Sequence, residues 1–146
     1  MSNSLQTLLA GLLAAEAAFL VNRSLLHALD EEARAGGRPL PGPGSLLVSA
    51  IPAVEEAAKD VVALLSGADL FGTHVVFGLA EAGFETIVGE GRGLVAGLFG
   101  LCGHALFGAA TSWALARTTS AFLAAGAGLA LHIAWNAVAL KVGRRA

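Results

Sequence analysis

The sequence predicts an all-α protein, a multi-pass transmembrane helix bundle with about five spans. Apolar residues make up 55% of the chain and charged residues only 14%, well below the charged fraction of about a quarter in soluble domains. The mean hydropathy is +0.71. Five apolar runs approach the roughly 20 residues that a helix needs to cross the hydrocarbon core of a bilayer. They cover about residues 5–21, 44–65, 70–88, 94–116 and 120–140.

The first run, residues 5–21, is expected to be retained as a span. No lysine or arginine precedes it, and a signal peptide needs a basic N-terminal region. The polar stretch 22–43 is predicted to be a cytoplasmic loop with a short interfacial helix and a turn rich in proline and glycine. The later gaps are only a few residues long, so neighbouring spans are predicted to be antiparallel. The whole chain, residues 1–146, is interpreted as one membrane domain.

Basic residues predict the orientation of the bundle, because cytoplasmic segments of membrane proteins are enriched in lysine and arginine. With the N-terminus outside, the outside segments contain only Arg117. The inside segments then contain seven basic residues: Arg23, Arg34, Arg38, Arg92, Lys141, Arg144 and Arg145. The sequence therefore predicts a protein of the cell (inner) membrane with its N-terminus outside and its C-terminus in the cytoplasm.

The second run contains a group of charges in its middle, Glu55, Glu56 and Lys59. A charged side chain at the centre of a membrane helix costs about 2.5–3.5 kcal/mol on insertion scales. Both glutamates lie about one helical turn before Lys59, so Lys59 can neutralise one of them and leave the other free. Pro52, one turn earlier, is predicted to kink the helix. Charges retained in such a position indicate a functional site.

The last three runs carry further polar residues at similar depth, two in the third run, one in the fourth and two in the fifth. They are Glu81, Glu85, His104, His132 and Asn136. Polar side chains of membrane helices face the interior of the bundle. We therefore expect these residues to form one internal cluster with the charges of the second run.

A cluster of this composition could catalyse hydrolysis. A carboxylate in a low-dielectric pocket is a stronger base than one in water and can take a proton from an attacking water molecule. Histidine and asparagine N–H groups can stabilise the oxyanion that forms. The same histidines and carboxylates are acceptable ligands for a divalent metal such as zinc. No HExxH motif is present, so spacing alone does not decide whether a metal is used.

Four segments resemble the motifs of the PrsW-type intramembrane proteases, a glutamate-type family related to the CAAX/Abi proteases and the YhfC-type membrane proteins. Residues 51–59, IPAVEEAAK, are similar to the EExxK motif with its upstream proline. Residues 78–86 and 104–109 are similar to the second and third motifs. Residues 131–136 are similar to the fourth, HxxxN with a tryptophan before the asparagine. The four segments occur in the family's order, each inside a predicted span.

The resemblance implies an intramembrane protease that cuts a membrane-anchored protein such as an anti-sigma factor, with residues 44–140 as its protease-like core. The residues expected to carry the reaction are Glu55, Glu56, Lys59, Glu81, Glu85, His104, His132 and Asn136. Glu55 or Glu56 would be the base and Lys59 its electrostatic partner. Glu85, or Glu81 in its place, would orient water with His104, and His132 and Asn136 would stabilise the oxyanion. If the enzyme is metal-dependent, the expected ligands are His104, His132 and Glu85.

Two other classes of function fit the same residues. Buried glutamates and histidines also form proton relays, so a proton or ion transport protein is one alternative, although five short spans without an inverted repeat differ from most transporters. A non-catalytic membrane scaffold is the other. The net charge of −2 argues against a nucleic-acid partner, so the expected partners are the bilayer and a membrane-anchored substrate. His74, near a span end, is expected at a solvated or headgroup position.

Overall fold

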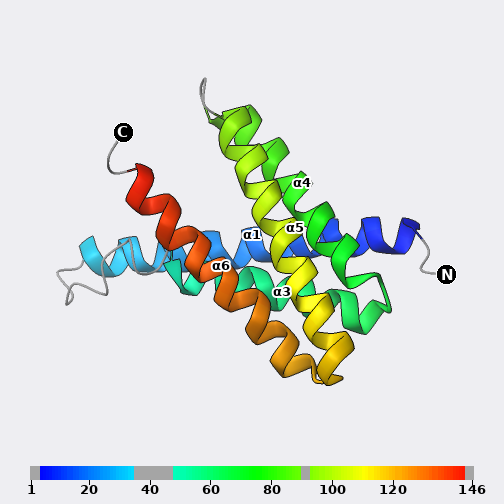
Figure 1. Ribbon diagram of the computed structural model, residues 1–146. Coiled ribbons are helices and arrows are strands. Elements are labelled where there is room, and N and C mark those ends of the chain that lie inside the picture. The colour runs from blue at the N-terminus through cyan, green and yellow to red at the C-terminus, as the bar shows by residue number, and fades with distance from the viewer. Residues whose placement is uncertain (1–3, 35–47, 90–92, 144–146) are drawn as a thin grey trace.

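The computed structural model describes residues 4–34, 48–89 and 93–143 (Figure 1). This part of the chain contains five α-helices and no β-strand, so the all-α prediction is confirmed. The helices are α1 (Ser4–Arg34), α3 (Ala50–Ser66), α4 (Leu70–Val88), α5 (Gly93–Thr118) and α6 (Ala121–Gly143).

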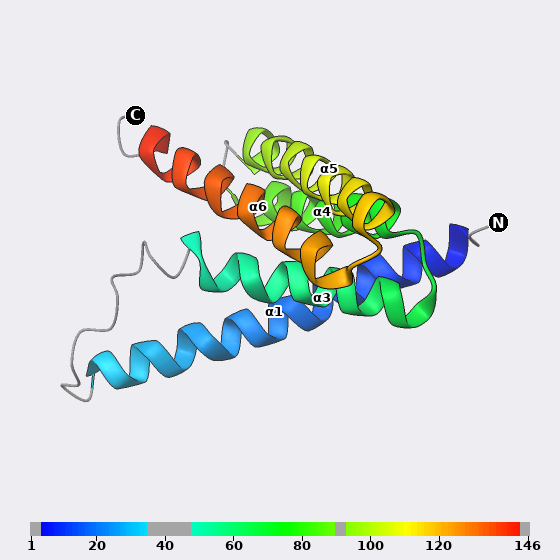
Figure 2. The same ribbon diagram turned by 60° about the horizontal axis from the view of Figure 1, so that its bottom comes forward.

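The helices form two crossed layers (Figures 1 and 2). Helices α1 and α3 lie side by side in one layer, and α4, α5 and α6 form the other. Helix α3 turns its polar side towards the second layer, because Glu56, Lys59 and Asp60 are buried whereas Leu65 is 85% exposed. A polar interior and an apolar outer surface are the reverse of a soluble helix. They are typical of a protein that is surrounded by lipid.

In the described part of the chain, three helical segments are long and apolar enough to cross a membrane: Ser4–Glu31, Gly93–Thr118 and Ala121–Lys141. Large apolar side chains also remain on the outer surface, such as Phe122 at 85% exposure. These features indicate a membrane protein in contact with a bilayer. Helices α3 and α4, which the sequence also predicts as spans, are not among the three. Helix α3 has only 17 residues and carries four charged side chains.

Helix α1 is longer than the first predicted span. The sequence predicts a short interfacial helix in the stretch 22–43, and the structure has helix there as far as Arg34, continuous with the first span. No proline or glycine occurs between residues 12 and 35, and an ion pair of 2.5 Å between Asp30 and Arg34, one turn apart, stabilises the exposed end. The helix in this stretch is therefore a continuation of α1. Residues 35–43 of that segment lie outside the described part of the chain.

The beginning and the end of α3 determine which residues it brings to the interior. The helix begins at Ala50, so Pro52 lies in its first turn. A proline in the first turn removes no hydrogen bond within α3, and the kink at Pro52 stays a prediction, because residues 44–47 before it lie outside the described part of the chain. The helix ends at Gly67, which adopts a left-handed conformation with φ of 70°. Asp69 then caps α4 by accepting a hydrogen bond from the backbone N–H of Gly72 at 2.6 Å.

Two glycines let α4 and α5 approach each other closely beside the site. Gly78 of α4 faces His104 of α5, and a Cβ at position 78 would lie 2.9 Å from His104 Cβ. Gly108 of α5 faces His74 of α4, and a Cβ at position 108 would lie 2.6 Å from His74 Cβ. Each histidine therefore occupies space that is free only because the facing residue is glycine and has no Cβ.

Candidate active site

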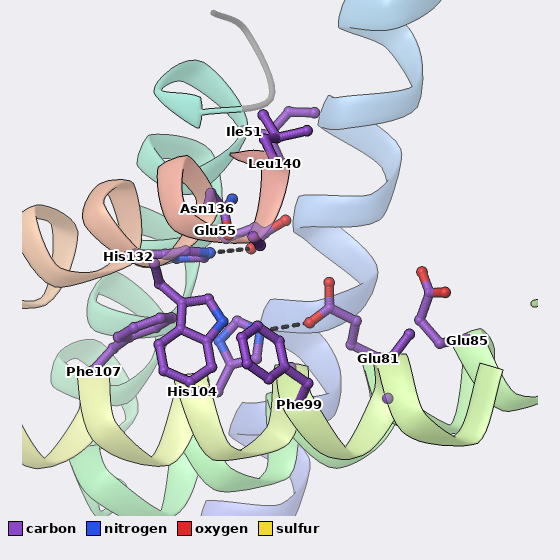
Figure 3. Close-up of a pocket in the computed structure, with 15 residues that line it drawn as sticks. Ile51, Glu55, Glu81, Glu85, Phe99, His104, Phe107, His132, Asn136 and Leu140 are labelled. Atoms are coloured by element: carbon purple, nitrogen blue, oxygen red, sulfur yellow. Dashed lines mark hydrogen bonds and ion pairs between the residues drawn. The ribbon is translucent and has the colours of Figure 1, made fainter. Parts of the chain in front are cut away.

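Six of the eight predicted site residues line one pocket. The pocket has a volume of about 430 Å³ and lies between α3, α4, α5 and α6 (Figure 3). Its polar residues are Glu55, Glu81, Glu85, His104, His132 and Asn136. The other two predicted residues, Glu56 and Lys59, are 2% and 0% exposed and do not line the pocket. The structure brings residues from four helices together, although they are distributed over more than eighty positions of the sequence.

Lys59 lies at the centre of the buried part of this cluster. Its Nζ donates to Glu56 Oε1 at 2.5 Å and to His104 Nδ1 at 3.0 Å. It also lies 4.5 Å from the centre of the Phe77 ring, within the range of a cation–π contact. A lysine without exposed surface needs such partners, because an unpaired buried charge is strongly destabilising. Glu56 is thus the glutamate that neutralises Lys59.

The hydrogen bond from Lys59 fixes the tautomer of His104. An ammonium group can only donate, so Nδ1 of His104 accepts. Neutral His104 therefore carries its proton on Nε2. This nitrogen lies 2.5 Å from Glu81 Oε2 and donates to it. Lys59, His104 and Glu81 form a directed chain of hydrogen bonds that ends at a carboxylate in the pocket.

His132 is held by Glu56 and by an aromatic ring. Its Nδ1 lies 2.8 Å from Glu56 Oε1 and donates to that carboxylate. The ring stacks on Phe107, with 4.5 Å between the ring centroids. Neutral His132 then presents the lone pair of Nε2 towards Glu55, whose Oε2 lies 3.7 Å away (Figure 3). This nitrogen can accept a proton, but in the neutral ring it cannot donate one.

Glu55 makes longer contacts with the protein than Glu56 does. Asn22 Nδ2 donates to Glu55 Oε1 at 3.3 Å, and His132 Nε2 lies 3.7 Å from Glu55 Oε2. Glu56 Oε1, in contrast, receives two contacts shorter than 3 Å from Lys59 and His132. Glu55 also lines the pocket, whereas Glu56 does not. The geometry therefore favours Glu55 over Glu56 as the carboxylate that meets a reacting molecule.

Glu81 is the glutamate of α4 that contacts His104. Figure 3 shows Glu81 between Glu85 and the His104 ring, and the hydrogen bond to His104 comes from Glu81. Glu85 lies one turn further along α4 and is half-buried at the edge of the pocket. Of the two glutamates that the sequence left as alternatives, Glu81 has the position that can orient a water molecule beside His104.

Three polar residues outside the predicted set, among those that the structure describes, make polar contacts with the site. His74 is fully buried, with Nε2 3.0 Å from Asp60 Oδ1 and Nδ1 3.7 Å from Glu56 Oε2. The expectation that His74 is solvated is wrong, because α4 crosses α3 at this point. Asp60 follows Glu56 by four residues and so lies on the same helical face, which is a signal that the sequence contained. Asn22 belongs to the segment predicted as a loop and reaches Glu55 from α1.

Two groups of side chains have ligand atoms close enough to hold a metal ion, within 4.8 Å of one another. The first consists of Glu56, His104 and His132, and Lys59 Nζ already lies against its Glu56 and His104. The second consists of Glu55, Glu81 and His104 and lines the pocket. Glu85, expected as a ligand with His104 and His132, belongs to neither group. If a metal binds, the second group fits it better, because this group lines the pocket, and the metal would take the place of the proton on Nε2 of His104.

The fold and the site define a class of protein: a helical membrane protein with carboxylates and imidazoles enclosed between four of its helices. Comparisons with protein families, with curated proteins and with solved structures found no match to this chain.

Proposed function

We propose that this protein is an intramembrane endopeptidase, a hydrolase that cuts a peptide bond of a membrane-anchored protein. The observation that carries the proposal is the pocket in which Glu55 meets His104, His132 and Asn136. A carboxylate with long contacts, imidazoles and a carboxamide are the groups that base catalysis and oxyanion stabilisation need. The resemblance of four segments to PrsW-type proteases supports the same reaction.

In the proposed reaction, Glu55 removes a proton from a water molecule as the water oxygen attacks the carbonyl carbon of the scissile peptide bond. Glu81, which accepts the Nε2–H of His104 at 2.5 Å, orients this water. The carbonyl oxygen becomes negatively charged, and the carboxamide N–H of Asn136 donates to it. The carbon–nitrogen bond then breaks. The proton taken from water returns through Glu55 to the leaving amine nitrogen, so a new carboxylic acid and a new amine are released.

His132 has a different part in this reaction from the one that the resemblance implies. Its Nδ1–H is donated to Glu56 at 2.8 Å, so in the neutral ring Nε2 lacks a proton. It can hold the proton that Glu55 takes from water, across the 3.7 Å that separates the two groups, until Glu55 delivers that proton to the leaving amine. Only then does Nε2–H become a donor to the oxyanion, with Glu56 stabilising the imidazolium. His132 is therefore proposed as a proton acceptor first and an oxyanion donor second.

A divalent metal such as zinc is compatible with the donor set of Glu55, Glu81 and His104 in the pocket. When bound, such an ion would polarise the scissile carbonyl as a Lewis acid. The substrate class that we propose, a membrane-anchored protein such as an anti-sigma factor, follows from the resemblance to PrsW-type proteases.

The test compares the N-termini of membrane proteins in cells that carry the wild-type chain or Glu55→Gln at equal levels in the membrane. We expect new termini with the wild type and their loss with Glu55→Gln. Glu31→Gln is the matched control, because Glu31 is an exposed glutamate of α1, and it should behave like the wild type. The absence of any terminus specific to the wild type, under all stress conditions tried, would overturn the proposal.

A proton relay is the second candidate, and one observation favours it. A chain of titratable groups, buried except for Glu81 at its end, extends from Asp60 through His74 to Glu56, and from there through Lys59 and His104 to Glu81. A relay predicts proton flux into liposomes that contain the purified protein, and a loss of that flux in His74→Phe. A protein that neither cuts substrates nor conducts protons would instead be a non-catalytic scaffold.

A further inference from the structure

A second cavity lies on the other side of the same acidic residues. It has a volume of about 560 Å³ and lies between α1, α3 and α4. Glu55, Glu81 and Glu85 line both this cavity and the pocket between α3, α4, α5 and α6. The two cavities therefore adjoin at the carboxylates. A molecule held in the second cavity lies next to Glu55, the base in the proposed reaction.

The walls of the second cavity are mainly apolar and include Leu12, Phe19, Leu26, Phe77 and Phe84. Phe19 of α1 and Phe84 of α4 make an edge-to-face contact, with 5.8 Å between their centroids. The two rings are 45% and 50% exposed, so this contact bridges the two helices at the outer surface of the protein. On a membrane protein that surface faces lipid. The cavity thus offers apolar walls to a molecule that arrives from the membrane.

One polar atom in this cavity wall is buried without a hydrogen-bond partner in the described part of the chain. Asn22 donates from Nδ2 to Glu55 Oε1 at 3.3 Å. A carboxylate can only accept, so the NH₂ end of Asn22 must face Glu55 and Oδ1 must face another direction. Oδ1 is the buried atom without a partner. A buried acceptor of this kind requires a donor, and a rotation of the Asn22 amide that turns Oδ1 into the cavity would let a backbone N–H of a bound polypeptide supply it.

We propose that the second cavity is the specificity subsite for the substrate and takes a large apolar side chain next to the scissile bond, an assignment that rests on the endopeptidase function proposed above. The ligand is an apolar segment of a membrane-anchored polypeptide, and Asn22 Oδ1 accepts one of its backbone N–H groups. A lipid acyl chain fits the apolar walls but has no N–H group for Asn22. Asn22 also holds Glu55, so it links substrate binding to the position of the base.

The test measures which residues flank the bonds that are cut in the N-terminus comparison. Ala80 lines the cavity, and Ala80→Phe fills it. Ala57→Phe is the matched control, because Ala57 is exposed on α3 outside both cavities. Ala80→Phe should lower the ratio of cuts beside large apolar residues to cuts beside Gly, Ala or Ser by about tenfold or more. Phe84→Ala should change the ratio in the opposite direction, and Ala57→Phe should leave it unchanged.

The outcomes separate the subsite from the function. If the wild type cuts but Ala80→Phe and Phe84→Ala both keep its ratio, the subsite assignment is overturned while the endopeptidase function stands. If Ala80→Phe abolishes all cutting, the test depends on the ratio of cuts in Phe84→Ala: an unchanged ratio overturns the subsite assignment, and the expected change in the ratio supports it. Termini that never appear with the wild type would overturn both. Asn22→Leu should lower cutting at every site without changing the ratio. Cutting at the wild-type level in Asn22→Leu would refute the part assigned to Asn22.

Discussion

Glu55 and Glu56 are neighbours in the sequence, but α3 places them in different surroundings. Glu56 is tied to Lys59 at 2.5 Å and to His132 at 2.8 Å, whereas Glu55 lines the pocket with contacts of 3.3 and 3.7 Å. We expect Glu55→Gln to abolish cutting with little change in stability. Glu56→Gln should lower the free energy of unfolding by about 3–5 kcal/mol, because it leaves the Lys59 ammonium buried without a counter-charge.

Thermal and denaturant unfolding of the purified variants in detergent would measure this difference between the two glutamates. Glu31→Gln provides the reference for a glutamate that is exposed. Equal stabilities of Glu55→Gln and Glu56→Gln would contradict the assignment of Glu56 as the partner of Lys59.

Asp60 and His74 form a buried pair with a contact of 3.0 Å, and His74 also faces Glu56. Removal of one partner leaves the other buried without its hydrogen bond, whereas removal of both leaves fewer unsatisfied groups. We expect Asp60→Leu and His74→Phe each to destabilise the fold, and the double variant to be more stable than the sum of the single effects predicts. The coupling should lie at about 0.5–3 kcal/mol in a double-mutant cycle of unfolding free energies. Additive effects would show that the two side chains do not interact.

At the scale of single residues, the sequence predicted which residues gather but not which atoms pair. Helical spacing predicted that Lys59 neutralises one of two glutamates, and Glu56 does so. Spacing could not select between them, because both lie about one turn from Lys59 and the choice depends on packing against α5 and α6. Nor could it show that His74 is buried, since depth along a predicted span says nothing about which helix crosses at that point.

At the scale of helices, the contact between α4 and α5 depends on small residues beside the histidines. We expect Gly78→Ala and Gly108→Ala each to cost about 1–3 kcal/mol of stability, as overpacked interiors do. The added methyl group would lie 2.9 Å from His104 Cβ or 2.6 Å from His74 Cβ, and neither atom belongs to a flexible chain end. Gly83→Ala is the control, because a Cβ at position 83 of the same helix meets no atom within 4 Å. This control should be neutral or stabilising, since alanine favours a helix by about 1 kcal/mol over glycine.

Unfolding of these glycine variants in detergent gives the stability, and the yield of new N-termini gives the effect on the site. If Gly78→Ala and Gly83→Ala were equally stable, α4 and α5 would not approach as closely as the structure shows.

Each run that hydropathy predicts as a span contains a helix, but hydropathy could not show that the first helix continues without a break into the next stretch. Helix α1 continues past residue 21 to Arg34, because helix formation depends on the absence of proline and glycine as much as on apolar character. The apolar run of the second predicted span begins at residue 44 and α3 begins at Ala50, while residues 44–47 lie outside the described part of the chain. The first turn of that helix therefore contains Pro52, which the hydropathy pattern places well inside a span.

At the scale of the whole molecule, the two crossed layers explain why the site is internal. Helix α3 contributes Glu55, Glu56, Lys59 and Asp60 from one layer, and the histidines come from the other (Figure 2). The crossing could not be predicted from the sequence, because short gaps constrain which helices are neighbours but not the angle between layers. Asn22 shows the consequence, since α1 reaches Glu55 from a position that was assigned to a loop.

Helix α3, with 17 residues, is the shortest of the predicted spans. Its end nevertheless lies level with the beginning of α1. The backbone N–H of Asp69 donates to Thr7 Oγ1 at 3.3 Å, and the Gln6 side chain donates to the Ser66 carbonyl. If the N-terminus is outside, as the distribution of seven basic residues against one predicts, the turn between α3 and α4 is outside as well. In that arrangement α3 and α4 both cross the bilayer, which gives five spans, and Ser66 is accessible from outside.

Labelling of single cysteines with a membrane-impermeant reagent in intact cells tests this arrangement. The background is Cys102→Ala, which removes the one native cysteine. Thr118→Cys, at the end of α5, marks the outside, and Thr86→Cys, near the end of α4, marks the cytoplasm. If α3 and α4 both cross the bilayer, we expect Ser66→Cys to react as readily as Thr118→Cys.

If Ser66→Cys reacts no faster than Thr86→Cys while Thr118→Cys is labelled, only α1, α5 and α6 span the bilayer, and α3 and α4 form a re-entrant pair. The site would then open on the cytoplasmic side, since the turn between α3 and α4 would remain inside the bilayer. Labelling of Thr86→Cys alone would reverse the orientation of the whole bundle.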